Sequence, residues 1–255
     1  MTDEQRRSAL KKLGAADGDM DALLAYTADA FQPRANAGTD ELSPKWEGIW
    51  NRALFYCKTP PRLEMFASVA GAIPIIYPAS EDDFETLLRE IVYKGKAMPD
   101  TTNMGAQFVF GKTVRFIILS GKPYSNVPAS FFNLNESEWL EQSMIIRKHH
   151  ECAHYYTKRF LGSSRNNLHD ELIADFCGLY AAFGEYRAKW FMRFYDNRAA
   201  LYTRGMSDSA ADIVRAIAVA AAKGVEAWAG TAECAGLDEA GRIEYLAGKE
   251  LLEFI

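Results

Sequence analysis

Apolar residues recur at helical spacing along most of the chain, and this periodicity predicts helices on both sides of a central region of different character. The helices expected outside residues 135–184 are Glu4–Leu13, Asp19–Phe31, Pro44–Tyr56, Ser80–Tyr93, Arg187–Tyr195 and Ser207–Trp228. Gln32–Ser43 is rich in Pro, Gly, Asn and Asp, which is typical of a loop. Ser80 is a candidate N-cap, with Asp83 three residues later.

The central region contains short apolar and β-branched runs. Ala72–Tyr77 (AIPIIY) predicts one strand. Gly105–Gly121 contains two further runs, GAQFVF and TVRFIIL, on either side of Gly111-Lys112, and this pattern is typical of a β-hairpin. Because no linker interrupts the chain, we expect one domain over residues 1–255 of the α+β class, mostly helical with a small β-sheet.

Two successive helices are expected between residues 135 and 184. Asn135 is a candidate N-cap, followed by acidic residues in the first turns, and its helix should run to about Phe160. Gly162–Asn167 (GSSRNN) predicts a turn, and a second helix should run from about Leu168 to Phe183, ending near Gly184. A turn this short favours an antiparallel pair of helices.

Composition and charge exclude several classes of function. Of the 255 residues, 49% are hydrophobic and 25% charged, so the chain can bury a core that needs no metal to fold. The net charge of −5 and the absence of a basic run argue against nucleic-acid binding. We see neither a signal peptide nor a membrane-spanning segment, and the four widely spaced cysteines are expected to be reduced. We therefore expect a cytoplasmic protein.

All four histidines lie within 21 residues, at 149, 150, 154 and 169. His150-Glu151-Cys152-Ala153-His154 is an HExxH motif. On a helix, residues four apart share a face, so His150 and His154 can bind one metal ion. Glu151 can then reach a metal-bound water and act as general base. His149 is four residues from Ala153, so it cannot form the same pair.

The second helix offers carboxylates at the same spacing, Glu171 and Asp175. A catalytic zinc ion needs three protein ligands and an open position, and two histidines with one glutamate meet this need. Glu171 is the expected third ligand. Asp175 is expected outside the ligand shell, where it would accept the free N–H of a ligating imidazole, that of His150 being the first choice.

Two assignments stay open at this point. His169 is an alternative third ligand, which would give an all-histidine site. A positive group or a phenol should stabilise the oxyanion, and the sequence does not rank the candidates. These candidates are Tyr124, Tyr155, Tyr156, Arg165 and His169.

HExxH followed by ExxxD on the next helix resembles the gluzincin metallopeptidases, the thermolysin-like superfamily. The segment Glu171–Gly178 (ELIADFCG) is also similar to the second motif of small intracellular gluzincins of the ImmA/IrrE type. The resemblance covers about residues 135–185. It implies a zincin-like helix pair with His150, His154 and Glu171 as zinc ligands. It also implies Glu151 as general base and Asp175 as the residue that orients a histidine.

The expected function is a zinc-dependent hydrolase, a metallopeptidase (protease) that acts on a peptide or protein. Residues 105–185 would form its metal-binding core, and residues 1–100 an accessory or regulatory helical region. The strand within Thr113–Leu119 is a candidate edge for an extended peptide, or else an ordinary core strand.

Alternatives remain at the level of function and metal. The chain could hydrolyse a non-peptide amide or ester, or it could be a non-catalytic, metal-binding regulatory protein. Manganese, cobalt or iron could replace zinc. The sequence gives neither the substrate nor the oligomeric state.

Overall fold

A computed structural model describes residues 1–255 except 29–30, 32–44, 103, 112–113 and 163–166. The chain forms two compact units. The first, here the helical unit, comprises Met1–Asn36 and Tyr156–Ile255, and the second, the sheet unit, comprises Ala37–Tyr155. The loop predicted at Gln32–Ser43 lies outside the described residues, and the expectation of a single domain stays a prediction.

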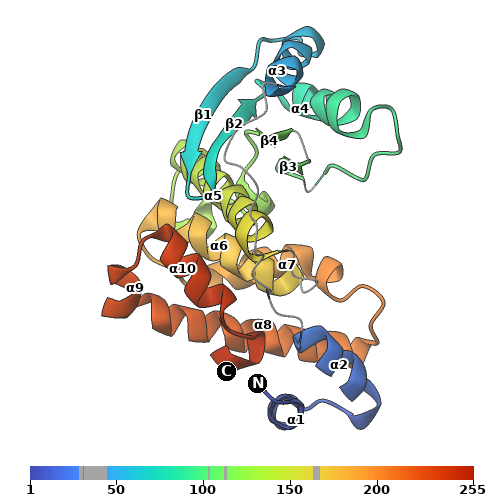
Figure 1. The fold of residues 1–255 in the computed structure, drawn as a ribbon, viewed down its shortest axis with the longest axis vertical. Helices are drawn as coiled ribbons and strands as arrows, with labels where there is room; N and C mark the ends of the chain where they lie inside the picture. Colours follow the sequence, from blue (N-terminus) through green and yellow to red (C-terminus); the bar gives the residue numbers. More distant parts are fainter. Residues whose placement is uncertain (29–30, 32–44, 103, 112–113, 163–166) are drawn as a thin grey trace. The chain divides into compact units, whose positions relative to one another are not determined.

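The sheet unit contains a four-stranded mixed sheet in the order β1-β2-β4-β3 (Figure 1). Its strands are β1 (Arg62–Ser68), β2 (Gly71–Tyr77), β3 (Ala106–Phe110) and β4 (Arg115–Leu119). β2 and β4 are parallel, whereas β1 pairs with β2 and β3 pairs with β4 in antiparallel fashion. The predicted hairpin is therefore confirmed as β3–β4.

The prediction of an edge strand within Thr113–Leu119 is wrong. β4 pairs with β2 on one side and with β3 on the other, so it is an internal strand. The four residues after Arg115 are all buried, because an internal strand with helices on both faces needs apolar side chains in both directions. The alternative of a core strand is confirmed, and β3 is the outer strand at this end of the sheet.

Helices cover both faces of this sheet. On one face lie α3 (Lys45–Tyr56), α4 (Glu81–Leu87) and the π-helical turn η2 (Leu88–Tyr93). They share a core with β2 and β4 made of Ala53, Ile76, Phe84, Leu87, Leu88, Ile91, Phe116 and Ile118. On the opposite face lies α5 (Glu136–Tyr156) (Figure 1). There His149 meets Phe66 of β1, and Tyr155 meets Phe108 of β3.

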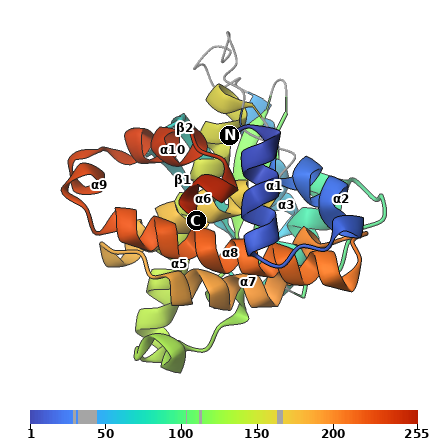
Figure 2. The ribbon, with the colours of Figure 1, turned by 90° about the horizontal axis from the view of Figure 1, so that it is seen from below.

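The helical unit is built around the long helix α8 (Asp208–Ala229). α8 packs against α2, α7, α9 and the C-terminal turn η6 (Figure 2), while α10 and α7 pack against α6. The bounds of these other elements are α1 Asp3–Lys12, α2 Met20–Thr27, α6 Asn167–Phe183, α7 Ala188–Tyr202, α9 Ala232–Gly236, α10 Glu239–Ala247 and η6 Leu251–Phe254.

The fold class is confirmed as α+β, mostly helical with a small sheet. Within the described part of the chain, none of the helices combines the length with the apolar character that a membrane crossing requires.

Candidate metal centre

The HExxH motif lies near the end of α5, a helix whose start is capped as the sequence predicts. The Asn135 Oδ1 atom accepts a hydrogen bond from the Glu138 backbone N–H at 2.9 Å, and Glu138 Oε2 accepts from the Asn135 N–H at 3.0 Å. These reciprocal bonds satisfy two N–H groups that a helix start leaves unpaired. α5 ends at Tyr156 and continues as a π-helical turn, η5 (Thr157–Leu161), close to the predicted end.

His150 and His154 face each other on this helix. Both are buried, and their ring centroids lie 4.7 Å apart. Their Nε2 atoms are 3.1 Å apart, so one nitrogen donates a proton to the lone pair of the other. Two nitrogen ligands of a tetrahedral zinc ion lie roughly 3.3 Å apart, because each Zn–N bond is about 2.0–2.1 Å long. The separation of the two nitrogens therefore fits a zinc ion.

The second nitrogen of His150 also has a partner. The Tyr124 hydroxyl lies 2.8 Å from His150 Nδ1, and both side chains are buried. Tyr124 belongs to the short turn η3 (Tyr124–Asn126), 26 residues before His150. The sequence suggested Tyr124 only as an oxyanion candidate and assigned the outer nitrogen of His150 to Asp175. No local pattern pointed to the contact that the structure contains.

Glu151 is half-buried, and Arg147 lies one turn before it on α5. Burial lowers the pKa of Arg147 to about 10, and electrostatic interactions with Tyr124 and Glu151 oppose this shift. Arg147 donates to the carbonyl oxygens of Ser120 at 2.8 Å and of Lys122 at 3.0 Å. The positive charge near Glu151 is thus held in place by backbone carbonyls.

The two carboxylates of α6 share one basic partner. Arg198 of α7 donates through Nη1 to Glu171 Oε2 at 2.6 Å and through Nη2 to Asp175 Oδ2. Glu171 is half-buried and Asp175 is fully buried. Their spacing on one helix face is confirmed, but sequence reasoning missed Arg198. It is one of 29 basic residues and lies 27 positions after Glu171, so no sequence signal singled it out.

The tyrosines that end α5 have partners of their own. Tyr155 is fully buried against Phe108 and Phe110, and its hydroxyl accepts from Arg115 at 3.1 Å. Tyr156 donates to Glu244 Oε1 at 2.5 Å. Both side chains are therefore part of the packing of their own units. Arg165, the basic oxyanion candidate, lies outside the described residues.

The remaining histidines have other surroundings. His169 is buried in the helical unit, where its Nε2 lies 3.0 Å from the Leu246 carbonyl oxygen and its ring meets Phe31 and Phe254 edge-on. This burial lowers the pKa of His169 below its ordinary value. His149 points to the sheet and meets Phe66 at 5.7 Å. These surroundings suit packing roles.

Among the described residues, the set with the chemistry to hold a metal ion is His150, His154 and Glu171. All four cysteines are free, and Cys152 and Cys177 are buried. Burial of this kind is usual for cysteines that act as small apolar residues.

Comparison with known protein families identifies one family for this chain. The model of a family described as "Family of unknown function (DUF7005)" matches residues 112–248, which is more than half of the chain. The chain belongs to this family. No curated protein and no solved structure matches it. The matched region contains Tyr124, the HExxH motif, both carboxylates of α6 and Arg198.

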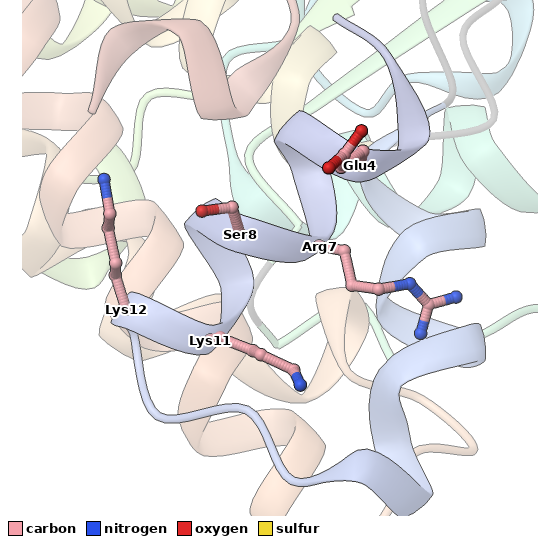
Figure 3. A pocket seen from close by; sticks show the side chains of 5 residues that line it. All are labelled: Glu4, Arg7, Ser8, Lys11 and Lys12. Atoms are coloured by element: carbon pink, nitrogen blue, oxygen red, sulfur yellow. The ribbon is translucent and has the colours of Figure 1, made fainter.

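A shallow depression on α1 lies outside the region that the DUF7005 model matches. It is lined by the exposed side chains of Glu4, Arg7, Ser8, Lys11 and Lys12 (Figure 3). Arg7 pairs with Asp21, and Lys11 with Asp17, each at 3.5 Å. Exposed pairs of this kind are typical of a solvated helix face and indicate no ligand.

Proposed function

We propose that this protein is a zinc-dependent hydrolase, with His150, His154 and Glu171 as metal ligands and Glu151 as general base. The observation that carries the proposal is the pair of buried imidazoles on α5, whose Nε2 atoms converge to 3.1 Å. A hydrogen bond between two imidazoles does not account for an HExxH motif with a carboxylate next to the first histidine. A metal site accounts for both.

The outer nitrogen of His150 supports this assignment. Histidines that bind metals through one nitrogen almost always donate the N–H of the other to a fixed acceptor. The Tyr124 hydroxyl, 2.8 Å from Nδ1, can serve as such an acceptor. Glu171 as third ligand rests on the ExxxD pattern and leaves a fourth position open, as catalysis requires.

A zinc ion in this place would lower the pKa of a bound water toward ~7 and polarise a substrate carbonyl. The chain supplies the rest of the chemistry. Glu151 accepts the proton of the attacking water and delivers it to the leaving group. Arg198 donates a hydrogen bond to Glu171 Oε2 and so helps to hold this carboxylate in place.

We propose a peptide or protein as the substrate, on the basis of the gluzincin-like motif order, and the cytoplasm as the location. Hydrolysis of a non-peptide amide or ester is the second candidate. A metal-binding protein without activity is the third, and Glu151 argues against it, because a purely structural site has no use for that carboxylate.

The test combines metal content with hydrolysis. Elemental analysis of the purified wild type should find about one zinc ion per chain, as a single site requires. Glu151→Gln should keep the zinc and lose about 10²–10⁴-fold in the hydrolysis of a peptide library, because the general base is gone. A wild type that carries no metal and takes up none would refute the proposal. Bound zinc with no hydrolysis of peptides, amides or esters would favour the non-catalytic alternative.

A further inference from the structure

We propose that Tyr124 is a positioning residue of the metal centre, and that Arg147 holds the loop that presents it. Tyr124 accepts the Nδ1–H of His150 and so directs the Nε2 lone pair of His150 toward the metal. This inference rests on the proposed function, and it adds a residue that neither the motif nor the family description contains.

The position of the imidazole proton decides which nitrogen of His150 can bind a metal. A neutral imidazole carries one N–H, and the nitrogen that binds a metal must be the other one. His150 faces His154 with Nε2, and if this nitrogen binds the metal, the proton of His150 belongs on Nδ1. The Tyr124 hydroxyl oxygen, 2.8 Å away, accepts that proton. Since this partner is a phenol, it adds no charge to the site.

The loop before Tyr124 is tied to α5 at two further points. The Tyr124 backbone N–H donates to Ser143 Oγ at 2.9 Å. One turn later on α5, Arg147 donates to the carbonyl oxygens of Ser120, Lys122 and Pro123, at 2.8, 3.0 and 3.5 Å. Together with the contact to His150, these bonds attach Tyr124 and the residues before it to three successive turns of α5.

A buried arginine is an unusual residue for holding a loop against a helix. The Arg147 side chain is only 2% exposed, and its guanidinium donates to backbone carbonyls. Burying a guanidinium in this way is costly, so a simple packing role would be better served by an apolar residue. Gly105, the residue before β3, makes room for it, because a Cβ atom there would lie 2.7 Å from the guanidinium.

The backbone after Tyr124 is strained. Ser125 and Asn126 have φ angles of +51° and +54°, in the left-handed region that non-glycine residues rarely enter. Strained backbone of this kind persists only where the surrounding structure fixes it, and it clusters at functional sites. The strain, the buried cation and the contact to His150 all lie within residues 120–150.

The first test compares Tyr124→Phe with Tyr77→Phe. Tyr77 is a matched control, because it is also buried in the sheet unit and its hydroxyl donates to Glu64 at 2.6 Å. In a chelator competition, Tyr124→Phe should bind zinc about 10–100-fold more weakly than wild type, the usual loss when the partner of a ligating histidine is removed. Tyr77→Phe should bind as wild type does. Equal affinity of Tyr124→Phe and wild type would overturn the inference.

The second test needs no metal. The chain has four histidines, so ¹⁵N NMR of the metal-free protein can assign the His150 tautomer. Wild type should carry its proton on Nδ1, and Tyr124→Phe should lose this preference. A wild type with its proton on Nε2 would refute the role of Tyr124. If wild type bound no zinc at all, the proposed function would fail, and the NMR result would still say whether Tyr124 fixes His150.

The role of Arg147 is tested with Arg147→Met. Zinc affinity and the Nδ1–H signal of His150 should weaken together, as in Tyr124→Phe. A folded Arg147→Met that keeps both would show that Tyr124 holds its place without the arginine. If Arg147→Met does not fold, Ser143→Ala, which removes only the bond to the Tyr124 N–H, should give the same changes at smaller size, and no change would count against the loop.

Discussion

The two helices that carry the proposed ligands satisfy their polar side chains in different ways. On α5, the imidazoles of His150 and His154 share a hydrogen bond, and Tyr124 meets the outer nitrogen of His150. On α6, Glu171 and Asp175 are charged and share the guanidinium of Arg198. The first arrangement is held by hydrogen bonds between rings and a phenol, and the second is an ion pair within the helical unit.

This difference indicates which of the two helices depends on a metal ion. When a metal ion binds both Nε2 atoms, the proton between them moves to the other nitrogen of its own ring, so both imidazoles stay neutral. The carboxylates already have a cation, and loss of that cation would leave the buried Asp175 uncompensated. We therefore expect changes on α5 to affect metal binding, and changes around α6 to affect stability.

The largest effect is expected for His154→Ala. It should abolish zinc binding, because one of two histidine ligands is gone. Zinc at ~1,000 times its Kd stabilises a folded protein by about 4 kcal/mol, and this gain should vanish in the variant. Urea unfolding with and without zinc measures it.

His169→Ala is the matched control for that experiment. It should keep the zinc effect while the metal-free protein loses about 2–4 kcal/mol, because a buried ring and its hydrogen bond are removed. If His169→Ala lost zinc and His154→Ala kept it, the ligand assignment would be reversed.

A smaller effect, mainly on stability, is expected for Arg198→Met. The metal-free variant should lose about 3 kcal/mol of unfolding free energy, because Asp175 becomes a buried charge without its partner. Added zinc should restore part of the loss, since it supplies a positive charge to Glu171. The measurement is the urea midpoint at matched zinc concentrations.

Arg242→Met serves as the control, because that side chain meets a backbone carbonyl and the Tyr180 ring rather than a carboxylate. Its loss should stay near 1 kcal/mol. Similar losses of unfolding free energy in the two variants would mean that the ion pair on α6 stabilises the protein no more than the contacts of Arg242 do.

The smallest effect is expected for His149→Ala. Its ring meets Phe66 on the sheet side of α5, and such a contact contributes about 0.5–1.5 kcal/mol. Zinc content should not change. Loss of zinc in this variant would place the metal on the sheet side of α5. It would contradict the assignment of the metal to His150 and His154.

Local pattern was sufficient for much of the fold. The Asn135 cap, the extents of α5 and α6 and the β3–β4 hairpin all follow from residues close together in the sequence. β1 was missed, because its exposed face breaks the apolar run that marks a strand. α9 and α10 were missed too, because five and nine residues are too few to establish helical periodicity.

The sequence by itself determined the pairs within one helix. His150 with His154, and Glu171 with Asp175, share a face because residues four apart on an α-helix always do. Only the tertiary structure decided what surrounds these pairs. Tyr124 lies 26 residues from His150, and Arg198 lies 27 and 23 residues from the two carboxylates of α6. Contacts over such separations depend on how strands, turns and helices pack. Helical periodicity predicts which residues meet within two turns of one helix. It gives no information about contacts between elements that are far apart in the sequence.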